Sequence, residues 1–139
     1  MQGVGNNNIK STVIVIAATN KPWQIDSAFL RPGRFDEKIY VPLPDEKARV
    51  KMFELYLKDI PVENDLDIDY LVEITDGFNG ADIKEVCEKL KMVAINEMIE
   101  TKNDIKIGMK HVEIIKDKIV SSVSLEDIEN LEEFEERFQ

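Results

Sequence analysis

The stretch Thr12-Val13-Ile14-Val15-Ile16-Ala17-Ala18 decides the fold class of the first part of this sequence. It is mostly β-branched and apolar on both alternating faces, which is typical of a strand buried in a parallel sheet with a layer on each side. A second strand is predicted at Lys38-Ile39-Tyr40-Val41. Because two strands cannot cover both of their own faces, we expect sheet neighbours that these residues do not supply, and the sequence looks truncated at its N-terminal side.

Beyond Pro44 the hydrophobic period changes from about two residues to about 3.6, so the rest of the sequence predicts helices joined by short turns. Asp45 is placed to cap the first helix, and Ser124 with Asp127 resembles a capping box at the start of the last one. Helices are expected over residues 45–58, 68–74, 81–100, 109–120 and 124–138. The predicted architecture is an α/β remnant with two strands over residues 1–44, followed by an all-α bundle over residues 45–139.

Composition and charge exclude several classes of function. The chain has 139 residues and a formal net charge of -10, which argues against binding nucleic acid or anionic lipid by bulk electrostatics. No apolar run approaches the roughly 18 residues that cross a bilayer. The single cysteine, Cys87, leaves no internal disulfide and fits a reducing compartment. We therefore expect a cytoplasmic protein, without membrane insertion or nucleic acid, whose partners are proteins or a nucleotide.

A polar pair, Thr19 and Asn20, follows the first predicted strand directly. In open parallel sheets, ligands bind beyond the carboxyl ends of the strands, and an amide such as that of Asn20 can orient a water there. The alternative is that both residues only complete a turn before Pro22, since asparagine is common in turns. The residues alone leave both interpretations open.

A tight turn around Pro32 and Gly33 is predicted to hold Arg31 and Arg34 on an exposed loop. Guanidinium groups bind phosphate bidentately, and an arginine finger stabilises the charge that builds on a transferring phosphoryl group. The alternative is a pair of surface arginines that form ion pairs with Asp26 or Asp36, which are common and weak.

Together these blocks resemble the second region of homology of the AAA ATPases, in order and without gaps. The blocks are Ala17-Ala18-Thr19-Asn20-Lys21-Pro22, Ile25-Asp26, Leu30-Arg31-Pro32-Gly33-Arg34-Phe35-Asp36 and Ile39-Tyr40-Val41-Pro42-Leu43-Pro44-Asp45. A later block, Gly77-Phe78-Asn79-Gly80-Ala81-Asp82-Ile83, is similar to the family's lid motif. The resemblance implies that residues 1–44 end the α/β subdomain of a P-loop AAA nucleotide domain, and that residues 45–139 form its helical lid with an acidic C-terminal helix.

The resemblance also implies roles for three polar side chains. Asn20 falls on the sensor 1 position, which in the family contacts the γ-phosphate and helps to place the attacking water. Arg31 and Arg34 fall on the arginine-finger positions, which in the family reach the nucleotide of the neighbouring subunit in a ring.

Four lid residues are implied in nucleotide binding by the same resemblance. Gly80 and Ala81 fall on positions that back the adenine and ribose, where a missing or small side chain allows close approach. Met52 and Tyr56 fall on lid positions that pack on adenine in related modules. Core packing of the first lid helix explains Met52 and Tyr56 equally well, so both interpretations stay open.

The phosphate loop and the catalytic acids of the family have no counterpart in this sequence. Residues 3–11 end in Lys10-Ser11 but lack a glycine before the lysine, and they precede a strand, whereas a P-loop follows one. ATP with Mg²⁺ is therefore the expected ligand of the intact module, with the Mg²⁺ ligands outside this chain, and the chain alone is expected to be inactive.

The implied function is ATP-driven remodelling or unfolding of protein substrates by a homo-oligomeric, hexameric ring that works with adaptors. The alternative is a non-catalytic module that docks on AAA rings or adaptors. Within the family, residues 31–36 and 131–138 resemble CDC48-like unfoldases, whereas residues 1–5 and 22–26 resemble the Vps4-like branch. The lid has no room for the insertion typical of the Vps4-like branch, which favours a CDC48-like protein.

Two further features are interpreted as structural. His111 is the only histidine and has no other ligand at metal-binding spacing, so it is expected on a helix surface. The acidic tail is expected to be a solvated helix face whose apolar edge, formed by Ile128, Leu131 and Phe134, packs on the lid.

Overall fold

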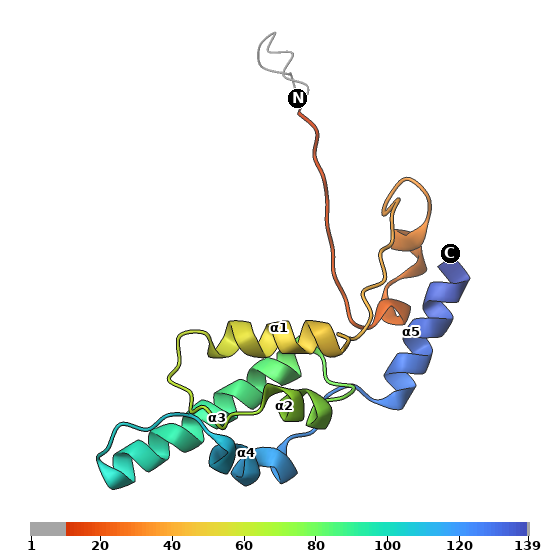
Figure 1. Cartoon of the computed structure of the whole chain (residues 1–139). Coiled ribbons are helices and arrows are strands. Elements are labelled where there is room, and N and C mark those ends of the chain that lie inside the picture. The colour runs from red at the N-terminus through yellow and green to blue at the C-terminus, as the bar shows by residue number, and fades with distance from the viewer. Residues whose placement is uncertain (1–10, 139) are drawn as a thin grey trace.

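The computed structural model describes residues 11–138, and helices dominate them. The α-helices are α1 Glu46–Leu57, α2 Ile68–Ile74, α3 Gly80–Thr101, α4 Met109–Ile115 and α5 Leu125–Phe138. Three short 3-10 turns accompany them, η1 Pro22–Gln24, η2 Ser27–Leu30 and η3 Lys116–Lys118. Helices α1 to α4 form one body, while α5 and the residues before α1 extend away from it (Figure 1). The predicted helical character of the second part is thereby confirmed.

The starts of α1, α2, α3 and α5 follow from capping side chains that the sequence places just ahead of their apolar stripes. Asp45 accepts a hydrogen bond from the backbone N–H of Ala48 at 2.8 Å, as predicted for the cap of α1. Ser124 Oγ accepts from the N–H of Asp127 at 3.0 Å, and the Asp127 carboxylate accepts from the N–H of Ser124 at 3.3 Å. The predicted capping box before α5 is therefore confirmed.

One helix is shorter than expected. The stretch predicted over residues 109–120 is α-helical only to Ile115 and continues as the 3-10 turn η3. The chain then leaves the helical path and hydrogen-bonds to the start of α3, where the N–H of Ser122 meets the carboxylate of Asp82. This bond satisfies a backbone N–H that a longer helix would have paired within itself.

The core lies between α1 and α3, with α2 packed on α1 and α4 packed on α3. An isolated parallel bridge between Val62 and Ile107 ties together the loops after α1 and α3. Burial raises the pKa of the Cys87 thiol to about 12, so this thiol stays protonated within the core. The largest fully buried side chains are Phe53, Leu71, Ile83, Leu90, Ile107, His111, Val86, Val112, Thr75 and Cys87.

The two predicted strands are not confirmed. Residues 12–18 and 38–41 have no assigned strand, and the side chains from Val13 to Ile16 are between 70% and 87% exposed. A β-strand is defined by ladder hydrogen bonds to a neighbour, and the apolar pattern of residues 12–18 needs covering layers on both faces. Within residues 11–138 neither a ladder partner nor such a layer is present.

The position of α5 differs from the expectation for the acidic tail. Its half-buried residues Ile128, Leu131 and Phe134 do not join the core cluster of the lid helices, and α5 contacts η1 instead. The side chain of Phe138 stacks against Phe134 with the ring centroids 4.5 Å apart. The apolar edge of the tail therefore faces the segment before α1.

None of the helices within residues 11–138 is long and apolar enough to cross a bilayer.

Candidate nucleotide site

The loop that carries Arg31 and Arg34 is a turn fixed by local chemistry. Gly33 has a φ of 85°, in the left-handed region that glycine adopts without strain. Its backbone N–H donates to the carboxylate of Asp36 at 3.0 Å, which closes the turn. Both arginine side chains are exposed on this turn. The turn therefore presents two exposed cations close together in the sequence.

The carboxylates proposed as alternative partners of these arginines bind backbone groups instead. Asp26 accepts from the N–H of Ala28 at 2.8 Å and so caps η2, while Asp36 accepts from Gly33. In the described part of the chain, Arg31 and Arg34 form no ion pair. The surface ion-pair arrangement considered for them is thus not the one present.

Asn20 lies at a bend directly before η1 and is exposed. The hydroxyl of the neighbouring Thr19 accepts the backbone N–H of Lys21 at 3.1 Å, so Thr19 provides the side-chain contact of this turn. The amide of Asn20 has no hydrogen bond to any other residue between 11 and 138. A bend is thus present before Pro22, and Thr19 rather than the side chain of Asn20 provides its hydrogen bond.

The lid candidates meet where α1 passes the start of α3. Gly80 is the first residue of α3, and a Cβ built on it would lie 3.7 Å from Cε and 3.9 Å from Sδ of Met52. Met52 and Tyr56 are half-buried and pack against the core, whereas Ala81 is exposed. The structure therefore brings Met52 and Gly80 together, and the partial burial of Met52 and Tyr56 is compatible with both interpretations of these residues.

The candidates fall into two separate groups. No hydrogen bond or ion pair within residues 11–138 joins Asn20 or the two arginines to the lid candidates. One group lies on the segment before α1, and the other lies on α1 and the first turn of α3. Each group is positioned by its own local turn or helix start.

Arg49 is a structural residue that the sequence reasoning missed. The residue is only 4% exposed, with Nη1 donating to the carbonyl of Pro44 at 3.0 Å and Nη2 to that of Val72 at 3.3 Å. Nη2 also lies 3.4 Å from the carboxylate of Asp76. Arg49 therefore fastens the end of the segment before α1 to the end of α2. The signal in the sequence was its position four residues before Phe53, which places Arg49 on the buried stripe of α1.

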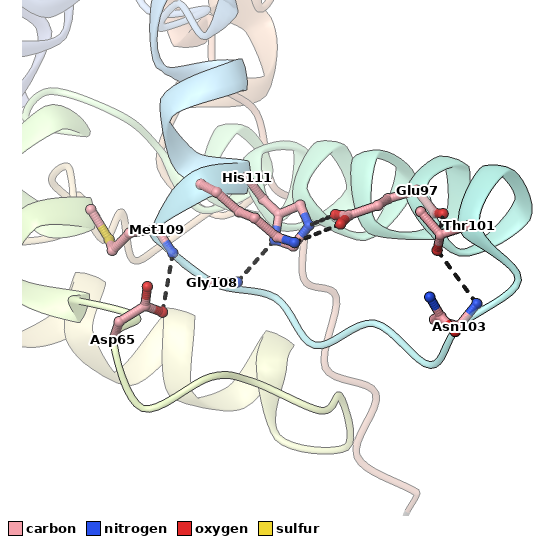
Figure 2. A network of polar contacts seen from close by, with 8 residues as sticks. Asp65, Glu97, Thr101, Asn103, Gly108, Met109 and His111 are labelled. Atoms are coloured by element: carbon pink, nitrogen blue, oxygen red, sulfur yellow. Dashed lines mark hydrogen bonds and ion pairs between the residues drawn. The ribbon is translucent and has the colours of Figure 1, made fainter.

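His111 lies in the interior, and the prediction that it lies on a helix surface is wrong. It is fully buried, and its Nδ1 accepts the N–H of Gly108 at 2.9 Å, while Nε2 lies 2.7 Å from the carboxylate of Glu97 (Figure 2). Because Nδ1 accepts, the ring proton sits on Nε2 and is donated to Glu97. The imidazole caps α4 in the manner of a capping-box side chain, so α4 can bury it against α3.

Glu97 receives hydrogen bonds from two residues of α4. The Nζ of Lys110 lies 2.5 Å from one carboxylate oxygen, and Nε2 of His111 contacts the other. The hydrogen bond from Lys110, followed by that from His111, holds the pKa of the Glu97 carboxyl below its ordinary value of 4.5. This network couples α3 to the start of α4 (Figure 2).

A Glu97→Gln variant is expected to be less stable than the wild-type chain at neutral pH and to lose less stability on acidification. A lowered folded-state pKa contributes stability that is present above the unfolded value near 4.5 and is lost as the pH falls below it. Urea unfolding at neutral pH and at successively lower pH measures this difference. The matched control is Glu100→Gln, an exposed glutamate of the same helix. Parallel curves for the wild type and Glu97→Gln would contradict the expectation.

Comparison with known proteins assigns the class of protein. Residues 1–43 match the model of the ATPase family associated with various cellular activities (AAA), and residues 65–113 match that of the AAA+ lid domain. The chain therefore belongs to the AAA ATPase family. It is 43% identical over 136 residues to the cell division cycle protein 48 homolog of Archaeoglobus fulgidus, across 91% of this chain and 19% of that protein. The predicted family is thus confirmed, and the similarity supports its CDC48-like branch. The chain therefore spans about a fifth of the length of this relative.

Proposed function

We propose that this chain is the C-terminal part of an AAA module that couples ATP binding and hydrolysis, in a ring, to the remodelling or unfolding of protein substrates. The observation that carries the proposal is the pair of exposed arginines, Arg31 and Arg34, on a turn closed by Gly33 and Asp36 in a chain of the AAA family. Family membership supports the ATPase chemistry, and the turn supports the role of the arginines.

Arg31 and Arg34 act as arginine fingers in this proposal. They form no ion pair within residues 11–138, so their N–H groups are available to phosphate oxygens in a bidentate arrangement. A guanidinium beside a transferring phosphoryl group stabilises the charge that develops in the transition state. We assign both arginines to the nucleotide of the neighbouring subunit. Asn20 serves as sensor 1 in the site of its own subunit, where its free amide orients the attacking water.

The lid residues bind the base and ribose. Gly80 lacks a side chain and lies against the thioether of Met52, which offers a polarizable apolar surface to an adenine ring. Ala81 is exposed beside it, and Tyr56 lies one helical turn beyond Met52. The small side chains at positions 80 and 81 leave room for the nucleotide to approach the backbone of α3.

ATP with Mg²⁺ is the ligand of the intact module in this proposal, and the metal neutralises charge on the phosphate oxygens. No residue of this chain is assigned to the metal, because the phosphate loop and the catalytic acids of the family have no counterpart in its sequence. We place the division between the α/β subdomain and the lid at residues 44 and 45, where Asp45 caps α1. The proposed assembly is a cytoplasmic homo-oligomer, a hexameric ring, whose partners are protein substrates and adaptors.

The chain alone is expected to bind adenosine weakly at the lid and to leave ATP unhydrolysed. Adenosine should shift the amide resonances of Gly80 and Ala81, whereas tripolyphosphate should not, because these residues contact base and ribose. Phosphate release from ATP should stay at background, since the sequence has no phosphate loop.

A Gly80→Val variant should lose the adenosine response because its branched side chain fills the space beside Met52. The matched control is Lys84→Ala, an exposed residue one turn further along α3. If adenosine shifts neither amide in the wild-type chain, the lid does not hold the nucleotide and the docking-module alternative is favoured.

A further inference from the structure

We propose that Asp82 is a positioning residue that fastens the nucleotide-backing turn of the lid to α5, and through α5 to the segment that follows Asn20. The inference rests on the proposed function for Gly80, Ala81 and Asn20. It adds a physical connection between the two separate groups of candidates. The connection runs through the α5 linker, defined as residues 119–124.

The carboxylate of Asp82 binds the lid turn and the α5 linker with the same oxygen. Its Oδ2 accepts the N–H of Asn79 at 3.2 Å and the N–H of Ser122 at 3.1 Å, and the residue is only 6% exposed. In return, Oδ1 of Asn79 accepts the N–H of Asp82 at 2.8 Å, which completes the capping box of α3. A buried carboxylate that loses a donor pays a desolvation cost, so the cap of α3 and the linker stabilise each other.

Two further hydrogen bonds reinforce this attachment, and both involve residues just before Gly80. The hydroxyl of Ser121 donates to the carbonyl of Gly77 at 3.0 Å, and Nδ2 of Asn79 donates to the hydroxyl of Ser122 at 3.1 Å. Gly77 has a φ of 77°, so the turn that Ser121 grips depends on a glycine. The linker is therefore held at several points of the turn that precedes Gly80 and Ala81.

The other end of the connection is the packing of α5 along the segment before α1. Helix α5 contacts η1, the turn that begins two residues after Asn20 (Figure 1). Near its end, Nζ of Lys38 lies 5.3 Å from the centroid of the Phe138 ring, which is within the range of a cation–π interaction. Near its start, the side-chain and backbone hydrogen bonds to Ser124 hold the pKa of the Asp127 carboxyl below its ordinary value, and the charge of Lys21 lowers that pKa to a smaller extent.

The arrangement makes the lid turn and the sensor segment parts of one connected unit. Asp82 fixes the turn of Gly80 and Ala81 to the linker, and the linker leads directly into α5. Helix α5 in turn contacts η1, which begins two residues after Asn20. Loss of the Asp82 contact leaves every nucleotide-facing side chain in place but frees the turn from α5. The expected result is weaker binding of the base, together with local opening of α5.

The test uses the full 139-residue chain with Asp82→Ala, Asp82→Asn and Ser121→Ala variants. In Asp82→Ala we expect amide exchange of Ser122 and α5 to rise about tenfold or more, and the adenosine dissociation constant to rise by a similar factor. Asp82→Asn keeps an acceptor oxygen, so it should restore most of the protection from amide exchange and most of the adenosine affinity. Ser121→Ala changes only the linker side, yet it should also weaken adenosine binding. Lys84→Ala is the control and should match the wild type.

The outcomes separate this inference from the proposed function. If the wild-type chain binds no adenosine at Gly80 and Ala81, the proposed function fails, and the positioning role fails with it. If the wild type binds adenosine but Asp82→Ala and Ser121→Ala bind it equally well, the inference is overturned while the proposed function stands. Faster α5 exchange without a change in adenosine binding also overturns it, because Asp82 is then only a structural residue. Should Asp82→Ala fail to fold, Ser121→Ala and Asp82→Asn decide.

Discussion

Replacing Arg34 with alanine in the intact ring is expected to lower kcat about 10³-fold or more while leaving ATP binding nearly unchanged. The proposed finger meets the phosphoryl group in the transition state and adds little to ground-state binding. Arg31→Ala should behave in the same way. An Arg34→Lys variant is a useful control, because lysine keeps the charge but lacks the planar fork, and little activity should return.

Mixed rings test whether the arginine serves the neighbouring subunit. A subunit that carries Arg34→Ala and an intact phosphate loop is titrated with a subunit that carries the natural arginines and an inactive phosphate loop. Activity should reappear above that of either pure ring, because some interfaces then pair an intact site with an intact finger. An Asn20→Ala subunit should not be rescued, since sensor 1 serves its own site. If mixed rings form but activity never recovers, Arg34 is not a finger in trans.

His111→Ala is expected to destabilise the chain by about 2–4 kcal/mol. The change removes a fully buried ring and leaves the N–H of Gly108 without an acceptor, and Glu97 loses one of its two hydrogen-bond donors from α4. This is a large share of the about 5–15 kcal/mol typical of a domain. The midpoint and slope of urea unfolding measure the loss.

Conservative variants assign this loss to individual contacts. His111→Asn places an oxygen near the position of Nδ1 and should keep the Gly108 contact, so its loss should be smaller than that of alanine. Lys110→Ala removes only the exposed partner of Glu97 and should cost less than either. Equal midpoints for His111→Ala and the wild-type chain would show that the buried ring contributes nothing.

The sequence predicted helices well where capping chemistry and apolar periodicity agree. Asp45 and Ser124 begin helices in the structure, since a cap side chain acts on residues only three positions away. The strands at residues 12–18 and 38–41 were not confirmed, because ladder pairing depends on partners distant in sequence. His111 was misplaced for a related reason, since its partner Glu97 lies on another helix and a polar residue carries no sequence signal of burial.

In the candidate site, too, the features set by neighbouring residues could be predicted from the sequence, whereas contacts between distant residues could not. The turn around Gly33 could be predicted from Pro32 and Gly33, and the neighbourhood of Met52 and Gly80 follows from the packing of α1 on α3. The hydrogen bond from the backbone N–H of Ser122 to Asp82 could not be predicted, because every residue of a linker except proline offers the same N–H donor. The functional roles of Asn20, Arg31 and Arg34 remain predictions that the mixed rings test.

The core cluster of the lid is formed by buried side chains between Phe53 and Ile115, and α5 contributes none to it. Helical bundles with such local contacts fold in about microseconds to milliseconds. Ribosomes add about 5–20 residues per second, so α5 is completed about a second or more after the last core residue. During synthesis the lid core can therefore fold first. The α5 linker then binds a lid turn that has already folded, while α5 packs on η1, so the attachment through Asp82 is a late event in the maturation of the chain.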